Sequence, residues 1–172
     1  MKIDYKSLEK KIKINFKDKN LLTKSLTHKS YDKENNNEKI EFLGDRVLGL
    51  VIAKKLLEIY PNEKEGTLDK KFASLVNKKT CLIIAKRIDL QKYILTFNLK
   101  IKKSFIEDKV LADTCEALIG SVYLDKGFQV VEKLNHSRKR CHRPAISMPA
   151  NFNASMPPSL NQAGCASVAA IR

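Results

Sequence analysis

The sequence predicts an all-α fold, a compact helical bundle, from two observations. Up to about residue 134, apolar residues recur at the three- and four-residue intervals of amphipathic helices along nearly the whole chain. No Asn-Gly or Asp-Gly pair joins two alternating apolar runs, so the sequence offers no β-hairpin signal. With 172 residues, of which 43% are hydrophobic and 30% charged, the chain is long enough for one domain with a real core.

Three helices are expected in the first 60 residues. Leu8, Ile12 and Ile14 mark a short amphipathic helix near the N-terminus. Residues 19–27 are expected to form a second helix, and residues 37–60 a long third helix dense in Leu, Val and Ile.

Three further helices are expected before residue 128. Thr67 is expected to cap a helix whose apolar positions follow the i, i+4, i+7, i+8 rule, namely Leu68, Phe72, Leu75 and Val76. Another helix is expected over residues 80–88, and an apolar one over residues 110–124 that ends near Gly127. Loops are expected near residues 31–37, 61–66 and 97–109.

The long third helix has three acids and a glycine on one face. At about 100° per residue, Glu38, Glu41 and Asp45 fall within about 60° of one another. Gly44, three residues after Glu41, lies on the same face. Because glycine weakens a helix interior by about 1 kcal/mol relative to alanine, its place beside the acids calls for an explanation.

The last expected helix repeats this arrangement, with Asp113 and Glu116 three residues apart and Gly120 one turn later. Burying unpaired carboxylates is unfavourable, and Mg²⁺ removes the penalty because it takes hard oxygen ligands. A glycine on the same face lets a partner helix or a substrate backbone come close. The sequence therefore indicates a metal site, and the alternative is that these acids pair with lysines on a solvated helix face.

A formal net charge of +14 favours a polyanionic partner such as nucleic acid. No run of about 18 apolar residues occurs, and the N-terminus is charged where a signal peptide is apolar, so we expect a cytoplasmic protein with no membrane partner. The cysteines form no CxxC pair and are expected to be buried thiols: Cys81, Cys115, Cys141 and Cys165.

The composition changes abruptly after Leu134. Up to that residue the chain holds 26 Lys and 2 Arg, whereas residues 135–172 hold 1 Lys, 4 Arg, no acid and four of the five prolines. We interpret residues 1–134 as one domain and residues 135–172 as a disordered or aberrant tail, from a frameshift or a chimeric join. A natural basic linker is the alternative.

Four segments resemble, in order and spacing, the ribonuclease III family of double-stranded-RNA endonucleases. They are LTHKSY at 26–31, NEKIEFLGDRVLGL at 37–50, PNEKEGTLDKKFASLVN at 61–77 and ADTCEALIGSVYLDKG at 112–127. The resemblance runs from about residue 8 to about residue 133. It implies a ribonuclease III endonuclease domain-like helical bundle, as in bacterial members, here lacking the double-stranded-RNA-binding domain that usually follows.

The resemblance also assigns residues to roles. It implies that the catalytic carboxylates, which hold Mg²⁺ with Mn²⁺ as a possible substitute, are Glu41, Asp45, Asp113 and Glu116. Accessory positions that bind RNA or metal-associated water are Asn37, Glu38 and Glu65. Phe42 matches an aromatic that inserts into the partner subunit of a homodimer. A core role for Phe42, and a loop or helix-cap role for Asn37, are the alternatives.

The activity implied by the resemblance is hydrolysis of phosphodiester bonds in double-stranded RNA, leaving 5′-phosphate and 3′-hydroxyl ends, in the processing of rRNA and other RNA precursors. No small-molecule cofactor is expected. Lysines that could contact RNA phosphates, or simply solvate helix faces, are Lys70, Lys71, Lys78, Lys79, Lys100, Lys102 and Lys103. The alternative function is a catalytically idle double-stranded-RNA-binding or ribosome-associated helical domain. A helical enzyme acting on small diphosphates would need a DDxxD motif, which the sequence lacks.

Overall fold

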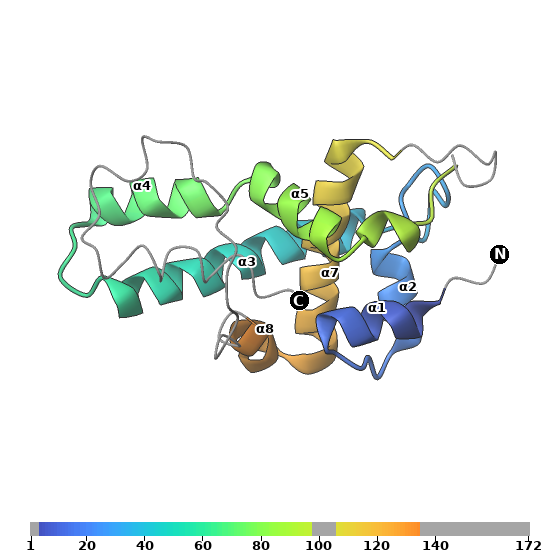
Figure 1. Cartoon of the computed structure of the whole chain (residues 1–172), viewed down its shortest axis with the longest axis horizontal. Coiled ribbons are helices and arrows are strands. Elements are labelled where there is room, and N and C mark those ends of the chain that lie inside the picture. The colour runs from blue at the N-terminus through green and yellow to red at the C-terminus, as the bar shows by residue number, and fades with distance from the viewer. Residues whose placement is uncertain (1–3, 98–105, 135–172) are drawn as a thin grey trace.

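The computed structural model describes residues 4–97 and 106–134, and helices dominate both ranges (Figure 1). The helices are α1 (Tyr5–Ile12), α2 (Lys19–Ser25), α3 (Glu38–Ile59), α4 (Glu65–Leu75), α5 (Lys78–Arg87), the 3₁₀ helix η1 (Leu90–Lys92), α7 (Asp108–Lys126) and α8 (Phe128–Leu134). Within these ranges no strand forms, and one isolated bridge joins Thr27 to Leu95. The predicted all-α fold is therefore confirmed.

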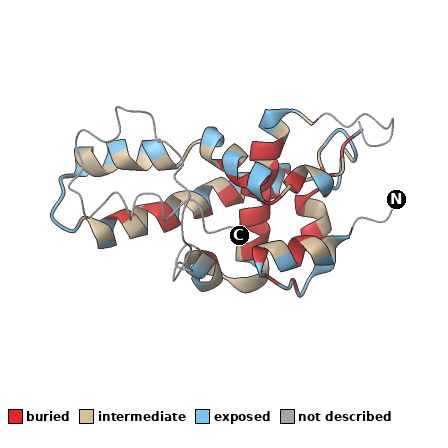
Figure 2. Cartoon of the chain, in the orientation of Figure 1, coloured by how far each residue is buried: buried red, intermediate tan, exposed pale blue. Residues whose placement is uncertain are grey.

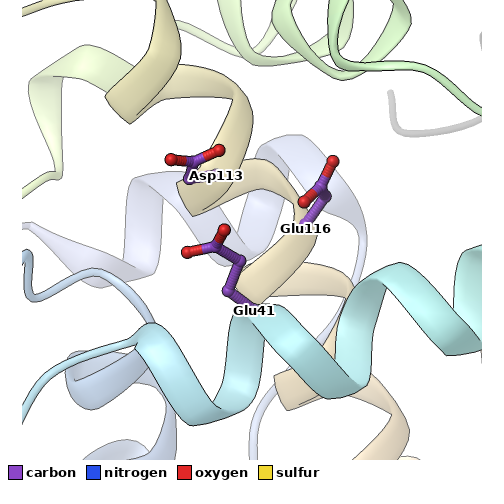
Figure 3. A group of neighbouring side chains, drawn as sticks. All are labelled: Glu41, Asp113 and Glu116. Carbon is purple, nitrogen blue, oxygen red and sulfur yellow. The ribbon is translucent and has the colours of Figure 1, made fainter.

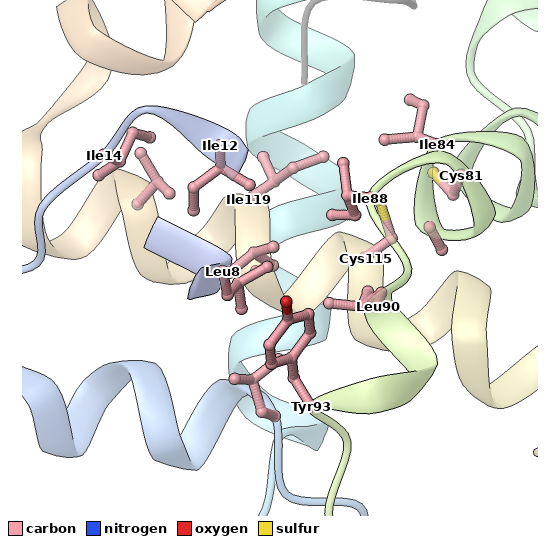
Figure 4. Packing of buried hydrophobic residues seen from close by; sticks show 14 of the residues in the cluster. Leu8, Ile12, Ile14, Cys81, Ile84, Ile88, Leu90, Tyr93, Cys115 and Ile119 are labelled. Carbon is pink, nitrogen blue, oxygen red and sulfur yellow. The ribbon is translucent and has the colours of Figure 1, made fainter. Parts of the chain in front are cut away.

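The core is organised around α7, whose residues from 111 to 122 are all buried except Asp113, which is partly buried. Its most extensive packing partner is α3, followed by α5. Figure 2 shows the buried segments concentrated on α7 and on the parts of other helices that lie against it. The core cluster includes Leu8, Ile12, Ile84, Leu90, Tyr93 and Ile119 (Figure 4). Because the middle of α7 is enclosed by its neighbours, Asp113 and Glu116 are held in a packed environment.

Two of the cysteines lie in this core. Cys81 on α5 and Cys115 on α7 are fully buried free thiols, as predicted. Cys141 and Cys165 lie outside the described residues, as does the whole predicted tail from residue 135. No helix among the described residues is both long enough and apolar enough to cross a membrane.

Aspartates anchor the loop between α1 and α2. Asp18 begins α2 by accepting hydrogen bonds from the backbone N–H groups of Asn20 at 2.8 Å and Leu21 at 3.2 Å. Near the end of α7, Asp125 accepts hydrogen bonds from the backbone N–H groups of Lys17 at 3.0 Å and Asp18 at 2.9 Å. These bonds fix the C-terminal part of α7 against the first two helices.

The second half of α3 projects from the core, and α4 lies alongside it (Figure 1). No residue of α4 is fully buried, although its predicted apolar side lies against α3. The ring of Phe72 reaches within 3.4 Å of where a Cβ on Gly49 would stand. The ammonium of Lys71 lies 4.3 Å from the ring centroid of Tyr60. Contacts between α3 and α4 thus help to hold the projecting pair together.

Several helix ends differ from the predictions. The prediction that Thr67 caps α4 is wrong: the helix begins at Glu65 after Lys64, and the Thr67 N–H bonds to the Lys64 carbonyl at 2.9 Å. Lys64 makes no side-chain cap, so the start of α4 has no sequence signal of the Ser/Thr type. The short α8 is an addition to the predicted helices, because the sequence predicts that the last helix ends near Gly127.

Two glycines form the crossing of α3 and α7. A Cβ on Gly44 would lie 1.8 Å from the backbone oxygen of Glu116, and a Cβ on Gly120 would lie 2.4 Å from the backbone oxygen of Ile40. Real Cβ contacts essentially never fall under 3.0 Å, so any side chain here would force the helices apart. The expected close approach at these glycines is confirmed, and it occurs between the two acidic helices.

Substituting Gly44→Ala should therefore destabilise the fold by about 3 kcal/mol or more, because the added methyl overlaps rigid backbone. Gly66→Ala is the matched control: no heavy atom lies within 4 Å of its Cβ position, in the first turn of α4. That variant should be unchanged or more stable by up to about 1 kcal/mol. Urea denaturation of both variants measures the difference, and equal stability would contradict the backbone contact.

Candidate metal and catalytic site

Three carboxylates meet where α3 crosses α7 (Figure 3). Glu41 comes from α3, and Asp113 and Glu116 come from α7; one oxygen of each lies within 4.8 Å of the others. Glu116 is only 6% exposed, while Glu41 and Asp113 are partly buried. The sequence placed each set of acids on one face of its own helix, and the fold brings the two faces together.

Burial and the closeness of these acids raise the pKa values of two of them, Glu116 and Glu41. Burial raises the pKa of Glu116 from 4.5 to about 7, and the charges of Asp45, Asp113 and Glu41 add to this rise, while Lys78 opposes it. Burial and, after it, the charge of Asp113 also raise the pKa of Glu41. The ionised cluster therefore repels itself, and a bound cation would relieve the repulsion.

Asp45 lies one turn after Glu41 on α3, outside the group of three. Its Oδ2 accepts a hydrogen bond from Nη1 of Arg46, the next residue. The guanidinium of Arg46 also lies over the ring of Phe42, with its Cζ 4.9 Å from the ring centroid. Asp45 is thus near the cluster but is held by a neighbouring cation.

A lysine enters the cluster from a third helix. Lys78 is the first residue of α5; its Nζ donates to Oδ1 of Asp113 and lies 3.9 Å from Oε1 of Glu41. Asn77 fixes the start of α5 because its side-chain oxygen accepts from the backbone N–H of Thr80 at 2.9 Å. From the sequence alone, Lys78 is only one of several lysines that could contact RNA, since no spacing rule links it to an acid 35 residues away.

The chemistry of the cluster fits a divalent cation. Carboxylate oxygens are the ligands that Mg²⁺ and Mn²⁺ prefer, and Mg²⁺ often completes its shell with waters and phosphate oxygens. The alternative of simple lysine pairing applies fully to Glu38, which is exposed and pairs with Lys29 at 2.7 Å. It does not account for buried Glu116, for which no lysine pair is found among the described residues.

The three accessory positions are not members of the carboxylate group. Glu38 is exposed at the start of α3, and Glu65 is exposed in the first turn of α4, at the outer end of the projecting pair (Figure 1). Asn37 is only 2% exposed, and its Nδ2 donates to Oγ1 of Thr114 at 3.4 Å. Asn37 therefore joins the start of α3 to α7 beside Asp113, and its side chain makes no helix-cap bond.

The surface of α3 that faces away from α7 carries three exposed apolar side chains. Phe42 is 65% exposed, so within one chain it is not a core residue. Leu50 and Leu57 are 59% and 60% exposed. At about 100° per residue both fall within about 80° of Phe42 around the helix. These three residues form an exposed apolar strip, which we call the α3 strip.

The raised pKa of Glu116 predicts how stability changes with pH when EDTA removes metal. A folded-state pKa of about 7, above the ordinary 4.5, means that the folded protein binds the proton more tightly, so stability falls as pH rises through this interval. After allowance for solvent screening, we expect a loss of about 1–2 kcal/mol between pH 5 and pH 8.

Glu116→Gln should flatten this dependence, because an amide does not ionise in this range. Glu63→Gln, in the exposed turn before α4, should keep the wild-type profile. Urea titrations at several pH values measure the effect, and identical slopes in wild type and Glu116→Gln would contradict it.

Comparison with known proteins identifies the family. The model of the family described as Ribonuclease-III-like matches residues 18–139. Ribonuclease 3 of Pelagibacter ubique (strain HTCC1062) is 68% identical over 133 residues, covering 77% of this chain and 60% of that protein. Ribonuclease 3 of Sulfurovum sp. (strain NBC37-1) is 42% identical over 148 residues, covering 84% of this chain and 66% of that protein. The chain thus spans less than two thirds of the length of these relatives.

Solved structures agree with this assignment. A structure of the nuclease domain of ribonuclease III from Campylobacter jejuni, at 2.2 Å resolution, matches with a TM-score of 0.68 and 40% identity. A second structure of that domain, described as showing structural flexibility in the region involved in dimer formation, matches with a TM-score of 0.69 and covers 76% of this chain and 92% of its own. The chain therefore belongs to the ribonuclease-III-like family, and its described residues have the fold of a ribonuclease III nuclease domain.

Proposed function

We propose that this chain is the nuclease domain of a divalent-metal-dependent endoribonuclease. The reaction is hydrolysis of phosphodiester bonds in double-stranded RNA, with Mg²⁺ as the metal and Mn²⁺ as a possible substitute. The observation that supports this most strongly is the convergence of Glu41, Asp113 and Glu116 from two helices. The names of the relatives, both Ribonuclease 3, support the same substrate class.

We assign a role to each carboxylate of the site. Glu41, Asp113 and Glu116 would hold the metal, and Asp45 would join them once its carboxylate leaves Arg46. A bound metal would supply an activated water and would stabilise charge on the departing oxygen. With the 3′ oxygen as the departing group, the products would have 5′-phosphate and 3′-hydroxyl ends. The chain itself contributes the fixed position of these carboxylates, because the backbone around them is held by the crossing of α3 and α7.

Charge and exposed residues support an RNA substrate. The net charge of +14 favours a polyanion, and Lys70 and Lys79 are exposed on α4 and α5. Lys100, Lys102 and Lys103 lie outside the described residues. Glu38 and Glu65 are proposed as accessory positions, whereas burial of Asn37 favours a positioning role. We assign this function to residues 1–134, with processing of rRNA and other RNA precursors in the cytoplasm as the biological setting.

A cleavage assay tests the proposal directly. A perfectly paired RNA of a few tens of base pairs should be cut in Mg²⁺ and left intact in EDTA. Glu116→Gln should lower the rate by at least about 100-fold, because it removes one metal-binding charge. Glu63→Gln, an acid in the exposed turn, should cut at the wild-type rate. Duplex binding without cutting in wild type would instead favour the catalytically idle RNA-binding domain.

We further propose that the α3 strip is the contact surface of a homodimer. A ring that is 65% exposed is unfavourable in water, and burying it against a second copy would remove that cost. The Campylobacter jejuni nuclease domain, which has a region involved in dimer formation, supports this assignment.

Phe42→Ala should raise the dimer dissociation constant by about 30-fold, as expected for a buried aromatic at an interface. Ile83→Ala, at a residue 46% exposed on α5, is the control and should leave the constant unchanged. Analytical ultracentrifugation over a concentration series measures both values. A wild-type monomer, or equal effects of the two substitutions, would exclude the α3 strip as the interface.

A further inference from the structure

The position of Lys78 has a consequence for metal binding. Its ammonium contacts Asp113 and lies 3.9 Å from a carboxylate oxygen of Glu41, so it stands between two of the three acids that converge. The contacted oxygens come from the same carboxylates that would hold a metal. The ammonium and a divalent cation would therefore compete for the same negative charge.

The surroundings of Lys78 allow it to leave. Its side chain is 56% exposed, whereas the side chain of Asp113 is 15% exposed. The lysine thus reaches into the cluster from the solvent side, while the carboxylate is fixed in the packed helix. Because a lysine side chain has several rotatable bonds, it can swing outward without disturbing the start of α5.

Other nearby lysines do not take this position. Lys29 pairs with Glu38, which lies outside the group of three. Lys109 acts on Glu41 only at a distance, through its charge. Among the ion pairs of the described residues, those of Glu41 and Asp113 are both made by Lys78.

We propose that Lys78 is a built-in counter-ion of the carboxylate cluster, which holds the acids together without metal and is displaced when a divalent cation binds. The proposal rests on the metal site proposed above and adds the identity of the competing group. Two effects follow: Lys78 stabilises the metal-free fold, and it weakens metal binding. Loss of the positive charge should therefore lower the stability of the metal-free protein and raise its affinity for a metal.

Direct metal titration, without RNA, tests the competition. The free and bound Mn²⁺ are measured by electron paramagnetic resonance for wild type, Lys78→Met, Lys78→Arg and Lys79→Met. Methionine keeps the length of the side chain and removes its charge, while arginine keeps the charge. Lys79 is the matched control, since it is the next residue and also exposed. Glu116→Gln shows whether the Mn²⁺ that is measured occupies the carboxylate cluster.

We expect Lys78→Met to bind Mn²⁺ more tightly than wild type, on the order of tenfold, because one nearby unit charge is removed. Lys78→Arg should gain no affinity, Lys79→Met should match wild type, and Glu116→Gln should bind weakly. Thermal unfolding gives a second readout. In EDTA, Lys78→Met should unfold about 2–4 °C below Lys79→Met, and saturating Mn²⁺ should reverse that order.

The outcomes separate this proposal from the one on which it rests. If wild type binds Mn²⁺ through Glu116 but Lys78→Met binds equally or more weakly, the counter-ion role is wrong and the metal site stands. If Lys78→Arg gains as much affinity as Lys78→Met, the effect comes from the shape of the side chain, and the counter-ion role is again wrong. If neither wild type nor Lys78→Met binds Mn²⁺, both the metal site and the counter-ion are excluded.

Discussion

The backbone contact between α3 and α7 is the constraint on which the site depends. At Gly44 and Gly120 the two helices approach so closely that a single methyl group would collide with main-chain oxygens. Each glycine weakens its own helix by about 1 kcal/mol, which the packing of the crossing must offset. In return, the acidic faces of the two helices meet, and carboxylates from separate helices come within 4.8 Å of one another.

The same crossing concentrates negative charge in a packed environment. The raised pKa of Glu116, caused first by burial, shows that the ionised cluster is unfavourable without a cation. Lys78 offsets part of this cost through Asp113 and Glu41, and a metal would offset more because it has twice the charge. The stability of the metal-free protein and its affinity for a metal are therefore opposed at this site. A carboxylate cluster whose charge is fully neutralised by the protein's own cations would bind a metal weakly.

The sequence predicted which residues share one face of a helix better than it predicted which residues of different helices contact each other. A 3.6-residue period places Glu41 and Gly44 on one face without any knowledge of the fold, because that relation is local. Whether Asp113 then meets Glu41 depends on how two helices cross, which only the shared glycine pattern suggested. The contact of Lys78 with Asp113 and the pairing of Asp45 with Arg46 had no signal, because exposed charged side chains have many rotamers and no fixed spacing. The start of α4 was misplaced for a related reason: its cap residue, Lys64, makes no side-chain bond.

Arg46 contacts two neighbouring side chains of α3 that have different proposed roles. Its guanidinium bonds to Asp45, beside the carboxylate cluster, and also lies over the exposed ring of Phe42, which is three residues before Asp45 and about 60° away from it around the helix. One cation thus contacts both a proposed metal ligand and the aromatic residue of the α3 strip. A partner that covers Phe42 and displaces the guanidinium from its ring would also change the hold on Asp45. The arrangement of α3 therefore links the surface available for a second copy to the orientation of the fourth carboxylate, through a single side chain.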